Sequence, residues 1–148
     1  MPSRSPRLAA RALILQGDKL LVVNAYPDGK SDLWCAPGGG VEKGFSVPEN
    51  LRREVYEETG LQVSVGAPCL VNEFHDPVSG FHQVEVFFRC KIIAGEIAES
   101  WQDPENIVTM RQFVTRTELE TLRFKPDSLP HVAWGRGMGY DPLEVIVT

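Results

Sequence analysis

One stretch of the sequence carries its own start and stop for a helix, and it constrains the fold more than any other. It reads GGGVEKGFSVPENLRREVYEETGL and occupies residues 38–61. Ser46 followed by Glu49 has the spacing of a capping box, and Pro48 falls in the first turn, where a helix has no backbone hydrogen bond to lose. Gly60 suits the left-handed residue that ends many helices. The stretch therefore predicts a helix from Ser46 to Gly60, preceded by a glycine-rich loop.

This helix carries three acids, Glu54, Glu57 and Glu58, on one face, because residues three and four apart are neighbours on a helix. Each like-charge pair opposes helix formation by about 0.2–0.5 kcal/mol, and acids in the last turn meet the negative end of the helix dipole. A solvated surface, with an ion-pair ladder from Glu49 through Arg53 to Glu57, is the ordinary interpretation of such a charge run. A site that uses the acids is the alternative.

The apolar residues of the helix favour that alternative. Val47, Leu51 and Val55 form a stripe, and at about 3.6 residues per turn Glu54 and Glu58 fall beside it. Carboxylates at the edge of a core need compensation, which a hard divalent cation with oxygen ligands supplies. The pattern therefore predicts a Mg2+ or Mn2+ site.

The glycines that precede the helix add a second component. Gly38, Gly39 and Gly40 let the backbone approach the helix closely and turn a carbonyl or an amide toward a metal-bound phosphate. Glycines and acids together resemble the Nudix box, a family motif written G-x5-E-x7-R-E-U-x-E-E-x-G-U, in which U is an aliphatic residue. The matching residues are Gly39, Arg53, Glu54, Val55, Glu57, Glu58, Gly60 and Leu61.

This resemblance implies an α/β Nudix fold, in which a mixed β-sheet is sandwiched between α-helices. It also implies hydrolysis of the diphosphate in a nucleoside diphosphate that is linked to another moiety X. Glu57 and Glu58 would bind the metal together with the carbonyl of Gly39. Glu54 would be a ligand or the general base, and Arg53 would orient a glutamate. The implied catalytic residues are Arg53, Glu54 and Glu57, and the implied substrate-binding glycines are Gly38 and Gly40.

One position departs from the motif, because Phe45 stands where the family has its first glutamate. The phenyl ring removes an acceptor and deprives Arg53 of a partner, for which Glu42 and Glu49 are the nearby substitutes. We predict a metal-dependent activity that persists at a reduced level. Two other classes stay open: a nucleotide-binding or regulatory Nudix module with weak or no catalysis, and an acidic surface helix used for protein contacts.

A further metal-binding acid is expected downstream, where the segment ESWQDPENI offers Glu99, Asp103 and Glu105. Glu105 is the first choice, with a solvated loop as the alternative. Glu85 lies in the alternating segment FHQVEVFFRC, one face of which would line a substrate pocket. A nucleoside diphosphate sugar and a modified nucleoside triphosphate both fit as substrates. The aromatic residues that could stack on a base are Phe74, Trp34 and Trp101.

The rest of the chain reads as short strands and a second helix between turns. The expected elements are a hairpin around Gly17-Asp18, a short strand near 33–36 inside a loop, a second hairpin across 61–95 that turns at 77–80, a loop at 96–107, a strand at 108–115, a short helix capped by Thr115 or Thr117, and an edge strand at 143–148.

Length and composition bound the remaining classes. The 148 residues fit one domain, 1–148, and a net charge of −5 argues against a broad nucleic-acid surface or an acidic-membrane binder. The three cysteines do not suit a disulfide framework, so reduced thiols are expected. The N-terminal stretch is broken by Arg11 and reads poorly as a signal peptide, and no run approaches the roughly 20 apolar residues of a spanning helix. We therefore expect a cytoplasmic protein whose partner is a nucleotide or a nucleoside diphosphate derivative; domains of this resemblance are frequently homodimers.

Overall fold

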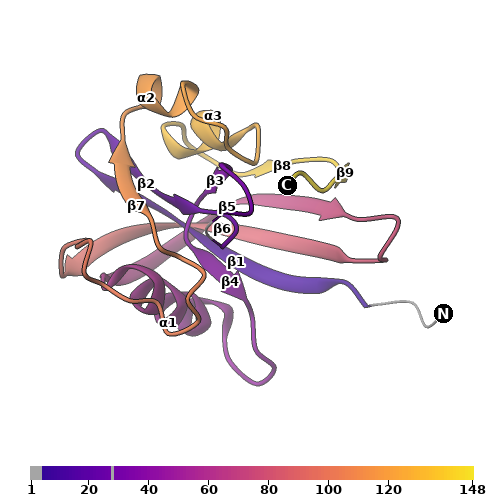
Figure 1. Ribbon diagram of the computed structural model, residues 1–148, viewed down its shortest axis with the longest axis horizontal. Helices are drawn as coiled ribbons and strands as arrows, with labels where there is room; N and C mark the ends of the chain where they lie inside the picture. The colour runs from indigo at the N-terminus through magenta and orange to yellow at the C-terminus, as the bar shows by residue number, and fades with distance from the viewer. Residues whose placement is uncertain (1–4, 28) are drawn as a thin grey trace.

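The described part of the chain forms a mixed nine-stranded sheet (Figure 1). The computed structural model describes residues 5–27 and 29–148, so the first four residues of the N-terminal stretch and Asp28 of the predicted loop lie outside the description. The strands are β1 (Arg7–Gln16), β2 (Lys19–Asn24), β3 (Trp34–Cys35), β4 (Gly38–Gly40), β5 (Gln62–His75), β6 (His82–Ala94), β7 (Arg111–Val114), β8 (Gly139–Tyr140) and β9 (Glu144–Val145). The helices are α1 (Val47–Thr59), α2 (Arg116–Glu120) and α3 (Leu129–Ala133).

The sheet order is β3-β2-β1-β6-β5-β8, with β4 beside β1, β7 beside β2 and β9 beside β5. β5 and β6 pair antiparallel, whereas β1 and β6 pair in parallel. Helix α1 lies on one side of the sheet, and the short helices α2 and α3 lie on the other (Figure 1). The predicted α/β class, with a mixed sheet between helices, is confirmed.

Each face of the sheet has its own apolar core because side chains alternate along the strands. On β1, Ala10, Ala12 and Ile14 pack with Leu51 and Val55 of α1 in one core. The other core joins Leu13 of the same strand to buried residues of α2 and α3. None of the helices within the described ranges has the length and apolar character to cross a membrane. All three cysteines are free thiols, as predicted.

Both predicted hairpins are present. Gly17 adopts the left-handed conformation, with φ of 63°, in the turn between β1 and β2. The second hairpin joins β5 to β6, where His75 pairs with His82 and the Asp76 N–H donates to the Phe81 carbonyl at 2.7 Å. This hairpin sends residues of β5 and β6 toward the same end of the sheet.

Helix α1 begins and ends where the sequence predicts. The Ser46 hydroxyl accepts the Glu49 N–H at 3.2 Å, which satisfies one of the free donors of the first turn. Gly60 has φ of 77°, and its N–H donates to the Tyr56 carbonyl at 2.8 Å. The predicted cap of α2 is also confirmed, because Thr115 and Glu118 form a reciprocal capping box.

Two regions differ from the prediction. Residues 38–40 were expected in a loop but form β4, in which Gly38, Gly39 and Gly40 pair with residues 9–11 of β1. A side chain at Gly38 would collide with the Ala10 carbonyl, so glycine permits this close pairing. In the C-terminal region, α3 and β8 were not predicted, and the expected edge strand shortens to β9. Strands β8 and β9 pair with β5, far away in the sequence.

Candidate functional site

The acids of α1 lie at the edge of the core that the helix covers. Glu54 is 9 % exposed and Glu58 is 5 % exposed, although both side chains are ionisable. Glu57 is half-buried, with 25 % of its side chain exposed. The prediction that Glu54 and Glu58 border the apolar stripe is therefore confirmed, and a freely solvated acidic face is ruled out for these two residues.

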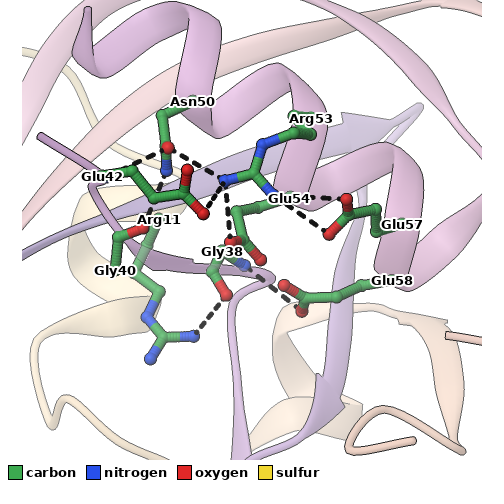
Figure 2. A network of polar contacts seen from close by, with 9 residues as sticks. All are labelled: Arg11, Gly38, Gly40, Glu42, Asn50, Arg53, Glu54, Glu57 and Glu58. Atoms are coloured by element: carbon green, nitrogen blue, oxygen red, sulfur yellow. Dashed lines mark hydrogen bonds and ion pairs between the residues drawn. The ribbon is translucent and has the colours of Figure 1, made fainter. Parts of the chain in front are cut away.

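Arg53 holds several of the surrounding acceptors (Figure 2). Its guanidinium donates to both carboxylate oxygens of Glu57, at 3.2 and 3.3 Å, and pairs with Glu54 at 3.5 Å. It also reaches Glu42 at 3.3 Å and the Asn50 side-chain oxygen at 3.0 Å. Arg53 thus orients the carboxylates of Glu54 and Glu57, and Glu42 in the preceding loop holds Arg53.

Strand β4 runs directly beside these acids. A Cβ at Gly39 would lie 2.9 Å from the Glu54 Oε2, so the backbone passes closer to this carboxylate than a side chain allows. The Gly38 N–H points to the Glu58 Oε1 at 3.4 Å, and the Asn50 amide donates to the Gly40 carbonyl at 2.8 Å. The glycines therefore bring backbone groups to the acidic edge, as their spacing predicts.

Glu105 completes a group of three carboxylates. Side-chain oxygens of Glu54, Glu57 and Glu105 lie within 4.8 Å of one another, although Glu105 belongs to the loop between β6 and β7. Of the other two loop acids, Asp103 is buried and accepts backbone N–H groups, while Glu99 is exposed on a different surface. The structure brings together three of the residues proposed as metal ligands, and their role as ligands stays a prediction.

The donor set fits a hard divalent cation. Burial raises the pKa of Glu54, an effect that Arg53 opposes. Burial also raises the pKa of Glu58 well above its usual range, against the opposing charge of Arg11. The anionic forms are therefore disfavoured without compensation, and several carboxylate oxygens within a few ångströms are the ligands that Mg2+ and Mn2+ take.

Two adjoining cavities surround this edge. The first, of about 450 Å3, is lined by Gly38–Gly40, Glu54, Glu58 and Glu105 among others. The second, of about 200 Å3, is lined by apolar and polar side chains that include Phe74, Phe81, Gln83 and Glu85. Arg7, Arg11, Ala25 and Cys35 line both cavities, so the acidic site opens toward a more apolar one.

The floor of the second cavity contains a charged pair that the sequence analysis did not identify. The Arg11 Nε donates to the Glu85 Oε2 at 2.7 Å, and Gln83 donates to the same oxygen at 2.9 Å. Arg11 also donates to the carbonyls of Ala36 and Gly38. Glu85 therefore lines the cavity as expected but is largely satisfied by protein donors. The sequence signal for this pair was Arg11 itself, a charged residue among the apolar residues of β1.

The candidate base-stacking aromatics lie in different places. Phe74 lines the second cavity and packs against Phe81, with ring centroids 6.1 Å apart. Trp34 packs against the core beside α2 and α3. Trp101 lies on the C-terminal end of α1, where it packs against Tyr56. Of the three, Phe74 alone lines either of these two cavities.

Comparison with known proteins agrees with this geometry. The family model described as NUDIX domain matches residues 5–135. Diphosphoinositol polyphosphate phosphohydrolase 2 of Rattus norvegicus is 34% identical over 100 residues, which are 66% of this chain and 50% of that protein. An ADP-ribose pyrophosphatase of Methanocaldococcus jannaschii is 30% identical over 92 residues, covering 62% of this chain and 54% of that protein.

The solved structures agree on the fold. The crystal structure of a UDP-X diphosphatase superposes with a TM-score of 0.73 at 24% identity, covering 95% of this chain and 70% of that one. This chain spans about half the length of the curated relatives it matches. Since the family model extends over most of the sequence and the fold has the same architecture, the chain belongs to the Nudix family.

Proposed function

We propose that this protein is a Mg2+- or Mn2+-dependent pyrophosphohydrolase that cleaves the diphosphate of a nucleoside diphosphate linked to a moiety X. The observation that carries the proposal is the group of Glu54, Glu57 and Glu105, whose carboxylate oxygens lie within 4.8 Å of one another. Glu54 and Glu105 also line the cavity beside the glycine strand, and this cavity adjoins an aromatic one. The relatives named as pyrophosphatases and phosphohydrolases support the same reaction class.

Each residue of the cluster has a defined task in this proposal. Glu54, Glu57 and Glu105 would hold the cation, with the Gly39 carbonyl and Glu58 as further ligands. A bound divalent cation supplies stabilisation of the negative charge that develops on the diphosphate. Glu54 would also accept the proton of the attacking water.

Arg53 would keep the acids in position. It binds Glu57 through two hydrogen bonds and lies 3.5 Å from Glu54, so both carboxylates are oriented before any substrate arrives. Preorganised charged groups lose little energy to rearrangement during a reaction. The backbone of Gly38 and Gly40 would border the phosphates, because a chain without side chains permits a close approach.

The second cavity would receive the nucleoside or X. Phe74 and Phe81 offer an aromatic wall. Arg7 extends over Gly40 between the two cavities and donates to Gln83 at 2.8 Å. Among the described residues Arg7 forms no ion pair with a carboxylate, so it is suited to a phosphate of the substrate.

The cations of this cavity favour a nucleoside diphosphate derivative over a polyphosphorylated inositol. Arg11 is paired with Glu85, and Lys125 is paired with Asp127 and Glu144. A ligand with many phosphates would need several uncompensated cations. Aromatic walls instead suit a flat base. Nucleoside diphosphate sugars and modified nucleoside triphosphates therefore both remain in the proposed substrate class.

Phe45 motivates a second candidate, a nucleotide-binding module with weak or no catalysis. Its side chain is 53 % exposed at the position that we assign to the first glutamate of the family motif. The ion pair between Glu42 and Arg53 favours the enzyme, because it supplies an acceptor that Phe45 cannot provide. We therefore propose that hydrolysis persists in this chain.

The test is a substrate panel with product analysis. ADP-ribose, UDP-glucose and oxidised nucleoside triphosphates would be incubated with Mg2+, with Mn2+ or with a chelator, and the products identified by ion chromatography. We expect cation-dependent cleavage of a diphosphate bond, lost in Glu57→Gln but retained in Glu49→Gln, an acid of the first turn of α1. Tight binding of these ligands without cleavage would establish the binding module instead.

A further inference from the structure

The loop between β6 and β7, residues 95–110, and the first residue of β7 are attached to the last turn of α1 at two points. Near the middle of the loop, the Trp101 Nε1 donates to the Glu57 carbonyl at 2.8 Å. At its end, the Arg111 guanidinium donates to the Glu58 carbonyl and, at 3.0 Å, to the Val108 carbonyl. Both helix carbonyls belong to the last turn, whose acceptors have few partners within the helix.

Trp101 is held by packing as well as by its hydrogen bond. Its ring meets Tyr56 edge to face, with centroids 5.2 Å apart. A Cβ at Gly60 would lie 2.9 Å from the indole ring, so the glycine that ends α1 also makes room for it. The indole therefore packs against the same turn of α1 that carries Glu57.

Between the two attachments the backbone forms a fixed turn. The buried Asp103 carboxylate accepts the N–H groups of Glu105, Ile107 and Val108, at 3.1, 3.3 and 2.9 Å. The Asn24 amide donates to the Ile107 carbonyl at 2.8 Å from the neighbouring strand β2. The backbone of Glu105 thus lies in a turn that is attached to α1.

From this geometry we infer that Trp101 is a positioning residue, which uses its indole N–H to set the Glu105 carboxylate against Glu54 and Glu57. The inference rests on the proposed function, because it takes Glu105 as a metal ligand. Trp101 itself lines neither of the two cavities, so it would act only through the loop. Trp101 would thus affect cation binding although it is not one of the proposed metal ligands.

The experiment uses Trp101→Phe, which keeps an aromatic ring and removes the hydrogen-bond donor. Trp134→Phe is the matched control, since the Trp134 Nε1 likewise donates to a backbone carbonyl, that of Asp18, at 2.9 Å. Mn2+ binding is measured by calorimetry without substrate, together with amide hydrogen exchange across residues 102–110. Loss of one hydrogen bond predicts Mn2+ binding weakened by about three- to ten-fold in Trp101→Phe, with unchanged binding in Trp134→Phe. Exchange in the loop should accelerate only in Trp101→Phe.

The background variant Glu105→Gln separates positioning from general stability. If Trp101 acts through Glu105, Trp101→Phe adds no further loss of Mn2+ affinity in that background. An equal additional loss there, or equal binding by Trp101→Phe and wild type, overturns the inference. Equal Mn2+ binding by Glu105→Gln and wild type overturns it too, while cation-dependent hydrolysis by the wild type would leave the proposed function standing. A wild type that neither binds Mn2+ nor hydrolyses a diphosphate removes both.

Discussion

Glu42 pairs with the Arg53 guanidinium at 3.3 Å, across the loop that leads into α1. Arg53 in turn binds Glu57 and Glu54, so this exposed acid acts on the site through one intermediate side chain. Glu42 lies three residues before Phe45, the position at which the sequence departs from the family motif. The loop before α1 therefore helps to orient the carboxylates of Glu54 and Glu57.

Replacing Glu42 with Gln should lower turnover by about two- to five-fold, because a surface ion pair contributes only about 0–1 kcal/mol. Unfolding in urea should change by less than about 1 kcal/mol for the same reason. Glu49→Gln, in the first turn of α1, serves as the control. Equal rates for wild type and Glu42→Gln would show that Glu42 does not substitute for the missing glutamate.

Restoring the motif by Phe45→Glu should raise turnover or Mg2+ affinity, because it adds a carboxylate to the loop whose Glu42 pairs with Arg53. The side chain is exposed, so the substitution should fold normally. Steady-state kinetics across a Mg2+ series would measure both quantities. If neither changes, residue 45 has no part in the arrangement of the metal-binding acids.

Gly39→Ala should weaken Mn2+ binding by more than about ten-fold, because the new Cβ would lie 2.9 Å from the Glu54 carboxylate and displace it. Gly139→Ala is the control: its Cβ would meet Leu70 at 3.6 Å, an ordinary contact, in the short strand β8. Calorimetry with Mn2+ and a thermal melt of each variant separate loss of the site from loss of the fold. Unaltered Mn2+ binding in a folded Gly39→Ala would contradict the close approach of β4 to Glu54.

Stability of the metal-free protein should fall as pH rises above about 4.3, the ordinary glutamate value. Burial raises the pKa of Glu58 well above its usual range and also raises that of Glu54, so the folded state holds protons that the unfolded chain releases. This stabilisation is complete below the unfolded pKa and is lost as pH passes through the folded one. Saturating Mg2+ should offset the loss, so the gain in Tm from Mg2+ should grow with pH.

The control for this pH effect is Glu58→Gln, whose neutral amide can still accept from the Gly38 N–H. Its metal-free Tm should depend less on pH than that of the wild type. Parallel pH profiles for the two proteins would show that the buried charge of Glu58 does not govern stability.

The buried pair of Arg11 and Glu85 should matter far more to stability than the exposed pairs. Arg11→Met leaves the Glu85 charge without its partner, which should cost about 3–5 kcal/mol in urea unfolding. Arg116→Met, which breaks the exposed pair with Glu120, should cost less than about 1 kcal/mol. Similar costs for the two variants would mean that the Glu85 carboxylate does not depend on Arg11 as its partner.

The local parts of the fold could be predicted from the sequence, and the long-range parts could not. Helix α1 follows from Ser46 and Gly60, whose capping interactions reach only three or four residues. Strand β4 depends on pairing between Gly38 and Arg11, far apart in the chain, so its glycines read as a loop. A glycine run gives no alternation of side chains from which a strand could be recognised.

The same limit applies to the candidate site. The acids of α1 share a face by helical spacing alone, and Glu105 was the first choice among three loop acids. Trp101 was considered for base stacking, but its partners are Tyr56 and the Glu57 carbonyl, 44 residues away. Such a contact leaves no periodic signal in the sequence, because the indole binds a backbone carbonyl, which every residue has.

The most direct measurement of the central claim is the position of Mn2+ by anomalous scattering in crystals grown with a nonhydrolysable nucleoside diphosphate analogue. We predict an anomalous peak for a Mn2+ ion that is bound by oxygens of Glu54, Glu57 and Glu105. The diphosphate should lie on the Gly38–Gly40 side of this ion, and the base should lie near Phe74. A nucleotide bound in the adjoining cavities without Mn2+ among these carboxylates, or with Mn2+ held elsewhere, would contradict the account.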